Sequence, residues 1–416
     1  MLRKLGSWLR VVAGLALAIA LAGCVSTPAP RVSLDNLPPS QVDLATRNLR
    51  VFNAAWSLVA DRHYDPKLQG VDWPAAGATF GPQAAAATDK KTLYAAINEM
   101  LDLLHDSHTH ALTPELAMER QTQQRARTGF NLTPLDGQWA VAEVVPGSPA
   151  ELAGVQRGWL VLARNGTPLA EKNDFRAQDG EVARWEFRDT HDQPVTLALV
   201  ARPLSTKPRQ EVRELPGGFI CLRFDGFDGP DRRWLSEQLK AHHNAPGVVL
   251  DLRQNPGGET FSLGITIGEF FEHTVDCGAF VSRSGARSEK NSWQFGSAHY
   301  TGHVAVLVDR ATASAAEIFS AVLQDHGRAT LIGRKTAGAV LASWFSVLPD
   351  GGELQLSRED YFAPKGRRLE GNGLEPDVKV LRTLEDLRAG RDADLEAALH
   401  VLQEAPAAAT PTAASR

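Results

Sequence analysis

The stretch from Thr301 to Ala339 restricts what this 416-residue chain can fold into more than any other part of it. It begins with the apolar run Val304–Val308, which is too short for a helix and is bounded by polar residues, a pattern typical of a buried strand. A turn of small residues follows, and residues 317–324 then carry apolar side chains at helical spacing, ending near Gly327, a residue suited to end a helix. The sequence therefore predicts a buried strand that passes through a tight turn into a helix.

Ser314 lies in this turn. Its hydroxyl is expected at the end of a sheet, beside the first unpaired N–H groups of the helix, which stabilise negative charge that develops on an oxygen. Serine is also a common N-cap residue. Ser314 is therefore either a nucleophile or only a helix cap, and the rest of the chain has to decide between these two interpretations.

The composition is that of a globular protein long enough for two or three domains, with 43% hydrophobic and 22% charged residues. The formal net charge is −5 and there is no basic block. Both features argue against a nucleic-acid partner.

Residues 1–23 have the pattern of an export signal, in which basic residues precede an apolar run too short to span a membrane. The run ends in L-A-G-C, which resembles the bacterial lipoprotein signal, in which the cysteine, here Cys24, becomes the lipidated N-terminus. Cleavage at an ordinary secretory site is the alternative. Residues 24–40 are rich in Pro and Ser and predict a flexible tether. We expect an exported lipoprotein of the cell envelope that faces the periplasm, and because Val25 is not acidic, nothing argues for retention on the inner membrane.

Residues 41–115 predict an N-terminal helical domain, because apolar side chains recur at spacings of three and four. Asp72 and Asp89 stand where helices are expected to begin. The last of these helices runs into the segment L-H-D-S-H-T-H, residues 104–110. Its H-x2-H-x-H spacing offers no i,i+4 pair and no cysteine is near, so no metal site is predicted. One of the histidines is instead a general base at a helix end, or the segment is a surface turn.

Residues 126–204 change to alternating strands and glycine turns. The run V-x-P-G-S-P-A-x-x-A-G and a following N-G turn resemble a PDZ domain, with Trp159 where that pattern usually has Asp. In that family a Gly-Phe-type loop binds a peptide's C-terminal carboxylate through backbone N–H groups, and the peptide adds as a strand. The resemblance gives this role to Gly129 and Phe130.

Residues 212–384 alternate strands with helices and predict an α/β core. A nearly continuous apolar strand, residues 247–253, leads into Gly257 and Gly258. Two glycines there indicate that the backbone approaches something closely, or only turns. Residues 385–416 predict a terminal helix and a disordered tail. Cys221 and Cys277 either pair or remain two buried thiols.

Several motifs then converge on one family. D-L-R-x-N-P-G-G (residues 251–258), T-A-S-A-x-E (312–317) and D-x-G-R-A (325–329) resemble the C-terminal processing peptidases, the S41 serine peptidases. The segment L-x-D-S-H-T, the PDZ-like insert and E-G-x-G-L-x-P-D-V (370–378) are similar to the same family. The resemblance covers residues 45–400 and implies a catalytic core of the ClpP/crotonase-like α/β type.

One branch of that family uses a Ser–Lys dyad, but here the lysine position holds Ala339. Lys335, four residues earlier, is an alternative candidate for the base. The other branch, similar to the tricorn protease core, uses a Ser-His pair, a nucleophilic Ser and a Glu. The resemblance assigns these roles to Ser107, His108, Ser314 and Glu370, although Glu375 is close to Glu370 in sequence.

The resemblance therefore implies a serine endopeptidase acting on peptides or protein tails, with Ser314 activated by His108. The backbone N–H group of Ala315 and that of Gly257 or Gly258 are the expected oxyanion hole. No cofactor or metal is implied, and the expected partners are a peptide or protein substrate and, through the lipid, a membrane. Two alternatives remain: a catalytically weak or inactive lipoprotein that binds peptides through the PDZ-like domain, and a non-peptide hydrolase or retinoid-binding-type relative on the same scaffold.

Overall fold

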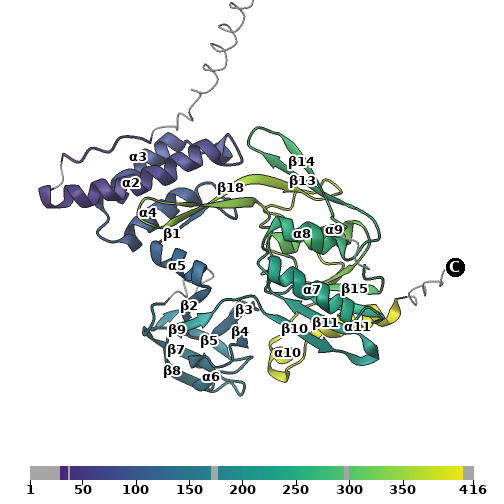
Figure 1. Ribbon diagram of the computed structural model, residues 1–416. Coiled ribbons are helices and arrows are strands. Elements are labelled where there is room, and N and C mark those ends of the chain that lie inside the picture. The colour runs from purple at the N-terminus through teal and green to yellow at the C-terminus, as the bar shows by residue number, and fades with distance from the viewer. Residues whose placement is uncertain (1–28, 36–37, 170–176, 295–298, 406–416) are drawn as a thin grey trace, which may run out of the picture.

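The computed structural model describes residues 29–35, 38–169, 177–294 and 299–405. Three parts follow one another along the chain: N-terminal helices, a β-rich middle domain and an α/β core (Figure 1). This arrangement confirms the predicted fold class. The exact domain boundaries stay a prediction.

The N-terminal helices are α2 (Pro39–Arg62), α3 (Trp73–Ala86) and α4 (Lys90–Asp102). The carboxylates of Asp72 and Asp89 accept hydrogen bonds from Ala75 N and Thr92 N, at 3.0 and 2.7 Å, and so cap α3 and α4 as predicted. The apolar faces of the three helices share one hydrophobic cluster with side chains of strand β18 (Glu353–Phe362). None of the described helices is long and apolar enough to cross a membrane.

Part of the predicted tether is packed rather than free. Ala29 lies against the helical cluster, and the Cβ positions of Gly77 and Gly81 on α3 are blocked by Pro30 and Val32. Helix α2 also begins at Pro39, inside the range assigned to the tether. Residues in the range 29–35 therefore contact the helices, because small residues on α3 leave room for the chain, and the tether stays a prediction.

A five-stranded sheet connects the helices to the core. Its order is β1 (His110–Leu112), β18, β13 (Asp276–Ser282) and β14 (Arg287–Asn291), with β17 (Ala342–Val347) also paired to β18. The first residues of β18 pair with β1, and its last residues pair with β13. One strand thus fixes the segment that follows α4 relative to the core.

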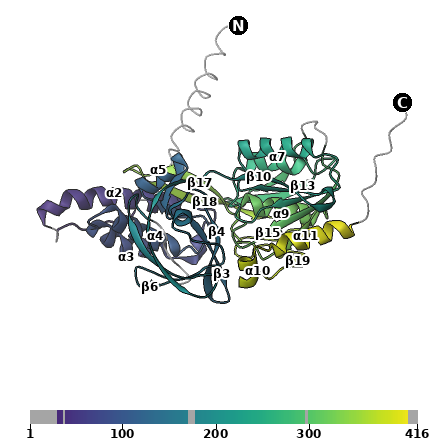
Figure 2. The ribbon, with the colours of Figure 1, turned by 90° about the horizontal axis from the view of Figure 1, so that it is seen from below.

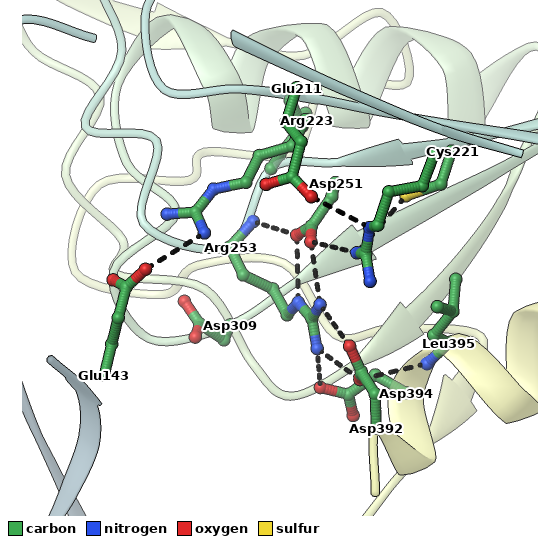
Figure 3. Close-up of polar contacts among 12 residues, drawn as sticks. Glu143, Glu211, Cys221, Arg223, Asp251, Arg253, Asp309, Asp392, Asp394 and Leu395 are labelled. Carbon is green, nitrogen blue, oxygen red and sulfur yellow. Dashed lines mark hydrogen bonds and ion pairs between the residues drawn. The ribbon is translucent and has the colours of Figure 1, made fainter. Parts of the chain in front are cut away.

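Helix α5 (Pro114–Thr122) and strand β2 (Gln124–Arg127), which pairs with β9 (Arg202–Ser205), lead into the middle domain. Its sheet contains β3 (Phe130–Leu135), β4 (Gln138–Val144), β5 (Leu160–Arg164), β6 (Thr167–Pro168), β7 (Val182–Arg188) and β8 (Pro194–Val200), with the short helix α6 (Pro149–Leu152). Glu143 on β4 pairs with Arg209 of the core side. It also pairs with Arg223 on β11 (Figure 3). Ionic contacts therefore join the middle domain to the core.

The core is a six-stranded sheet in the order β10 (Gln210–Glu214), β11 (Ile220–Phe224), β12 (Gly247–Asp251), β15 (His303–Val308), β16 (Thr330–Gly333) and β19 (Val378–Lys379). All neighbours are parallel except β10 and β11. Helices α7 (Gly229–Ala241), α8 (Thr260–Gly268) and α9 (Ala315–Asp325) cover one face, and α11 (Ala393–Glu404) covers the other. Figure 2 shows α7 and α11 on opposite sides of β15. Burial on both faces explains the nearly continuous apolar strands.

Two details differ from the sequence reading or decide between its alternatives. The predicted single C-terminal helix is two helices, α10 (Leu384–Ala389) and α11, because Gly390 adopts a left-handed conformation with φ +70° and ends the first. Cys221 and Cys277 are both buried and free, so they are two separate thiols.

Candidate active site

Ser314 lies in the turn between β15 and α9, directly before the first residue of the helix. Its place between an apolar run and a helical pattern predicts this position. Its backbone has φ +53° and ψ −121°, whereas an ordinary N-cap residue has an extended backbone with negative φ. A residue other than glycine in this region carries strain of about 1–3 kcal/mol, and such strain concentrates at functional sites. A serine on a strained strand-to-helix turn is also how the nucleophile is exposed in other hydrolases. The backbone conformation therefore favours a nucleophile over a simple cap.

The Gly257-Gly258 turn lies against Ser314. A Cβ on Gly257 would come within 2.7 Å of Ser314 Cβ and 2.8 Å of Ala315 N, and φ is +105° at Gly257. Only glycine fits at position 257. This explains why glycine follows the apolar strand β12.

Asn255, which is fully buried, holds this turn against the nucleophile. Its backbone oxygen accepts a hydrogen bond from Ala313 N at 3.0 Å, and its Oδ1 accepts one from Gly257 N at 2.9 Å. The N–H group of Gly257 is therefore already bonded, which favours Gly258 as the glycine donor of the expected oxyanion hole. Gly258 and Ala315 remain, and within the described ranges neither of their N–H groups donates to another residue.

Ser107, His108 and Glu370 form a hydrogen-bonded chain. Ser107 Oγ lies 2.6 Å from His108 Nδ1 and donates to Glu370 Oε2 at 3.0 Å. The backbone N–H of Ser107 donates to Glu370 Oε1 at 3.1 Å. Glu370 is 6% exposed, so these bonds form away from bulk water and the carboxylate is held in one place.

This chain assigns the proton on the imidazole. Since Ser107 Oγ–H points to the Glu370 carboxylate, Ser107 Oγ is the acceptor in its contact with His108, and Nδ1 carries the hydrogen. The lone pair is then on Nε2, which is the form that a general base needs.

The segment that carries the histidine is held by Asp106, a residue to which the sequence reading gave no role. Its side chain is 1% exposed and accepts hydrogen bonds from His63 Nε2 at 2.8 Å, from His108 N at 3.0 Å and from Thr109 N at 2.6 Å. His63 follows directly after α2 and is itself fully buried. The available signal was the aspartate directly before the Ser-His pair.

Glu317 is the second residue that was given no role, although it closes the T-A-S-A-x-E motif. It is fully buried and accepts hydrogen bonds from Gly338 N and Ala339 N, both at 2.8 Å, and from Ser314 N at 3.3 Å. Ala339 O in turn accepts the Ser314 N–H at 2.7 Å. Glu317 thus fixes the segment 336–340, which we call the support loop, against the nucleophile turn.

The support loop also reaches Glu370, because Val340 N donates to Glu370 Oε2 at 2.9 Å. Ser314 is therefore connected to His108 through the support loop, Glu370 and Ser107. No direct hydrogen bond joins Ser314 to His108 in the described structure. Such catalytic contacts are often long without a substrate and tighten when one binds.

Burial shifts the pKa values of His108 and Glu370. It lowers the pKa of His108 below its usual value, with nearby His110 acting in the same direction and Asp106 opposing it. Burial also raises the pKa of the Glu370 carboxyl, against the hydrogen bonds from Val340 and Ser107. The imidazole is thus kept neutral near neutral pH.

The alternative candidates Lys335, His105 and His110 lie at the surface. Lys335 Nζ lies 3.7 Å from Glu375 Oε1, and both side chains are about half exposed, so they form a surface ion pair. His105 and His110 are exposed. Within the described ranges no group of three His, Cys, Asp or Glu side chains is arranged to hold a metal ion.

The predicted peptide-binding pair lies at the start of β3. Gly129 has φ +98°, and a Cβ there would collide with Ser148. The Phe130 ring packs edge-on against Trp185 and Phe187, with centroids 4.9 and 5.8 Å away. Residues 170–176 of the middle domain, and the predicted lipidation residue Cys24, lie outside the described residues.

Two family models match the chain. The model of peptidase family S41 matches residues 219–380, which include Ser314 and Glu370. The model of the tricorn protease C1 domain matches residues 47–102, in the N-terminal helices.

Curated relatives and a solved structure agree with these matches. The carboxyl-terminal-processing protease of Synechocystis sp. is 28% identical over 384 residues, covering 86% of this chain and 87% of the relative. That of Picosynechococcus sp. is 27% identical over 345 residues, covering 78% and 81%. The structure of a photosystem II D1 C-terminal processing protease superposes with a TM-score of 0.58 at 24% identity, covering 87% of this chain and 98% of that one, and shows a common fold.

Proposed function

Because the chain belongs to peptidase family S41 and is a serine-type hydrolase of protein substrates, we propose that it cleaves peptide bonds with Ser314 as nucleophile and His108 as general base. The observation that carries the proposal is the chain Glu370–Ser107–His108, which leaves Nε2 of the imidazole as the acceptor. Ser314, on its strained turn, donates its backbone N–H to the support loop, and the loop in turn donates to Glu370 of this chain.

In the proposed reaction, Ser314 Oγ attacks the carbonyl carbon of the scissile bond and its proton passes to His108 Nε2. The oxyanion forms beside the N–H groups of Gly258 and Ala315, and loss of one such donor typically costs about 3–4 kcal/mol. The imidazolium then gives its proton to the leaving amine, and water hydrolyses the acyl-enzyme by the same proton transfers. Ser107 and Glu370 hold the imidazole in the required tautomer.

The proposal is tested by labelling the protein with a fluorophosphonate probe and by measuring hydrolysis of a peptide library. We expect labelling of the wild type to be lost in Ser314→Ala and in His108→Ala. Ser320→Ala is the matched control, because this serine lies on the same helix and only donates to Ala316 O. Labelling that survives His108→Ala would exclude the imidazole as the base. A folded wild type that binds peptides but takes no label would be a tethered binding protein.

The middle domain is proposed to recruit substrates by their C-terminal carboxylate at Gly129 and Phe130. The glycine conformation at position 129 and the fixed Phe130 ring support a preformed loop. A fluorescent peptide with a free C-terminus should bind the Ser314→Ala protein more tightly than its C-terminal amide. Equal affinities would remove the carboxylate from recognition.

We also propose that the protein acts in the cell envelope, attached through a lipid on Cys24. The support is the L-A-G-C sequence after a short apolar run. Mass spectrometry of the mature N-terminus should show an acylated cysteine, and Cys24→Ser should release the protein from the membrane fraction. An unmodified N-terminus elsewhere would replace the lipoprotein with a secreted form.

A further inference from the structure

Two strands of the core flank the strand that leads to the nucleophile, and each is followed by a buried or half-buried arginine. In the sheet, β12 and β16 lie on either side of β15. Arg253 follows β12, and Arg334 follows β16. Because these strands are parallel to β15, both arginines stand at the same edge of the sheet as the turn that carries Ser314.

One carboxylate from the C-terminal helix binds both arginines. Asp394, near the start of α11 and 2% exposed, accepts hydrogen bonds from Arg334 Nη1 and Nη2, both at 2.8 Å. It also accepts one from Arg253 Nη1 at 2.9 Å. Asp394 therefore bridges the ends of β12 and β16 across the nucleophile strand, and we call these three residues the Asp394 bridge.

Arg253 is held further by two neighbouring carboxylates (Figure 3). It forms paired hydrogen bonds with Asp251, at 2.9 and 2.7 Å, and with Asp392, at 2.7 and 2.9 Å. Bidentate pairs of this kind fix orientation as well as supplying energy. Arg253 is thus fixed between the end of its own strand and the first residues of α11.

Each arginine directly precedes a segment of the candidate site. Arg253 is followed by Gln254, which has φ +75°, and then by Asn255 and the Gly257-Gly258 turn. Arg334 is followed by the support loop, which accepts the Ser314 N–H and donates to Glu370. Both segments lie against the nucleophile turn, the first through Gly257 and the second through Ala339.

Asp394 remains charged in this setting. Burial would raise its pKa, but the guanidinium groups of Arg334 and Arg253 outweigh burial and hold the pKa below its usual range. A charged carboxylate between two guanidinium groups keeps both ends of the bridge bonded at neutral pH.

We propose that Asp394 is a positioning residue for catalysis, which sets the oxyanion turn and the support loop relative to Ser314 through Arg253 and Arg334. The proposal rests on the proposed function, since it gives these two segments their catalytic roles. Asp394 touches neither the nucleophile turn nor the Ser-His pair, so its effect is indirect. It also places a requirement for catalysis beyond residue 380, where the matched family model ends.

A role in folding alone is distinguishable because α11 packs by other means. Leu395, Ala398 and Leu402 lie in a hydrophobic cluster with β12 and β15. Asp394→Asn keeps this packing and the side-chain volume while it removes the charge. Arg334→Lys is a second variant that keeps the charge but loses the two-pronged contact. The control is Asp192→Asn, which removes an exposed ion pair between the middle domain and Arg388 of α10.

The first readout is hydrogen exchange followed by mass spectrometry on the full mature chain. We expect peptides that contain residues 254–258 and 336–340 to exchange about tenfold faster in Asp394→Asn, with the remaining core strands unchanged. Arg334→Lys should accelerate the support loop more than the glycine turn. Unchanged exchange in both segments would overturn the proposal, as would equal acceleration over the whole core.

The second readout is catalytic. Small displacements of catalytic groups cost up to about 10²-fold, so kcat and the rate of fluorophosphonate labelling should fall by about 10- to 100-fold while KM changes little. Asp192→Asn should match the wild type. If both segments loosen but kcat and labelling are unchanged, Asp394 has only a structural role and the proposal fails. Failure of the proposed function is recognised separately, because the folded wild type would then take no label at all.

Discussion

Glu370 Oε2 lies 3.0 Å from the hydroxyl of Ser107, although 263 residues separate the two in sequence. The same carboxylate accepts the backbone N–H groups of Ser107 and Val340. Glu370 therefore joins the segment that carries the histidine to the loop that supports the nucleophile. All three groups bonded to this carboxylate are hydrogen-bond donors.

Glu370→Gln should therefore lower kcat/KM by about 10²- to 10⁴-fold, the range typical of general-base catalysis. The glutamine NH₂ would face Ser107 Oγ and Val340 N at one position and Ser107 N at the other, so Ser107 loses an acceptor in either orientation. The histidine segment is then no longer held as in the wild type, and the imidazole loses its fixed tautomer. Steady-state hydrolysis of a fluorogenic peptide measures the effect. Glu375→Gln is the control, because Glu375 only pairs with Lys335 and Lys379 at the surface. Loss of activity in the control and not in Glu370→Gln would move the role to Glu375.

The acid limb of the pH profile should have its midpoint below about pH 6.5, the usual pKa of histidine. A general base must be neutral, and burial lowers the pKa of His108, so the base stays neutral to lower pH. The measurement is kcat/KM, or the rate of fluorophosphonate labelling, between pH 4.5 and 8. A midpoint above 6.5 would mean that a nearby carboxylate, not burial, dominates the imidazole.

Lys335→Ala should leave labelling and kcat/KM within about twofold of the wild type. The ammonium group pairs with Glu375 and is about half exposed, so it lies at the surface and not in the buried setting of a catalytic lysine. Exposed pairs of this kind contribute about 0–1 kcal/mol. Abolished labelling in Lys335→Ala, with the protein folded, would restore a Ser–Lys mechanism.

Glu317→Ala should destabilise the protein by about 3 kcal/mol. The buried donors Gly338 N–H and Thr336 Oγ–H lose their acceptor, and each unsatisfied buried donor costs about 1–3 kcal/mol. Urea unfolding measures the change. The control is Glu237→Ala on α7, an exposed glutamate whose replacement should stay within about 0.5 kcal/mol. Equal stability of the two variants would mean that the support loop is not held by Glu317.

Stability should fall as the pH drops from about 4 to about 2, in part through Asp392. Burial raises the pKa of Asp392, but Arg253 outweighs it and lowers the pKa to about 2, whereas an unfolded aspartate titrates near 3.9. A carboxyl group whose pKa is lower in the folded than in the unfolded protein stabilises the fold at pH values above its unfolded pKa. This stabilisation is lost as the pH falls through the folded pKa. The slope of unfolding free energy against pH should therefore be shallower in Asp392→Asn. An unchanged slope in Asp392→Asn would contradict this account.

Several parts of the fold and the candidate site follow from local patterns. The apolar run at 304–308 and the helical spacing after it place Ser314 between β15 and α9, because a buried strand and an amphipathic helix have different periods. Asp72 and Asp89 begin helices because their side chains satisfy free N–H groups. The proximity of Ser107 to Glu370 came only from a family resemblance, since no local pattern encodes a contact across 263 residues.

Other features could not be read from the chain. Gly257 looks like an N–H donor in sequence, but the side chain of Asn255, two residues earlier, occupies that group. The contacts of Asp394 depend on where two strands and a terminal helix end in space. The spacing of Arg253, Arg334 and Asp394 in the sequence does not predict that they are in contact.

The contact between Ser107 and Glu370 also bears on the order in which the parts of the candidate site are synthesised. Translation proceeds from the N-terminus, so a ribosome has delivered the histidine, the middle domain and Ser314 before Glu370 emerges. With Asp394 later still, the last parts to be synthesised are the ones that bring the earlier ones together. If these residues form the site as proposed, a growing chain cannot assemble it until synthesis has passed Glu370.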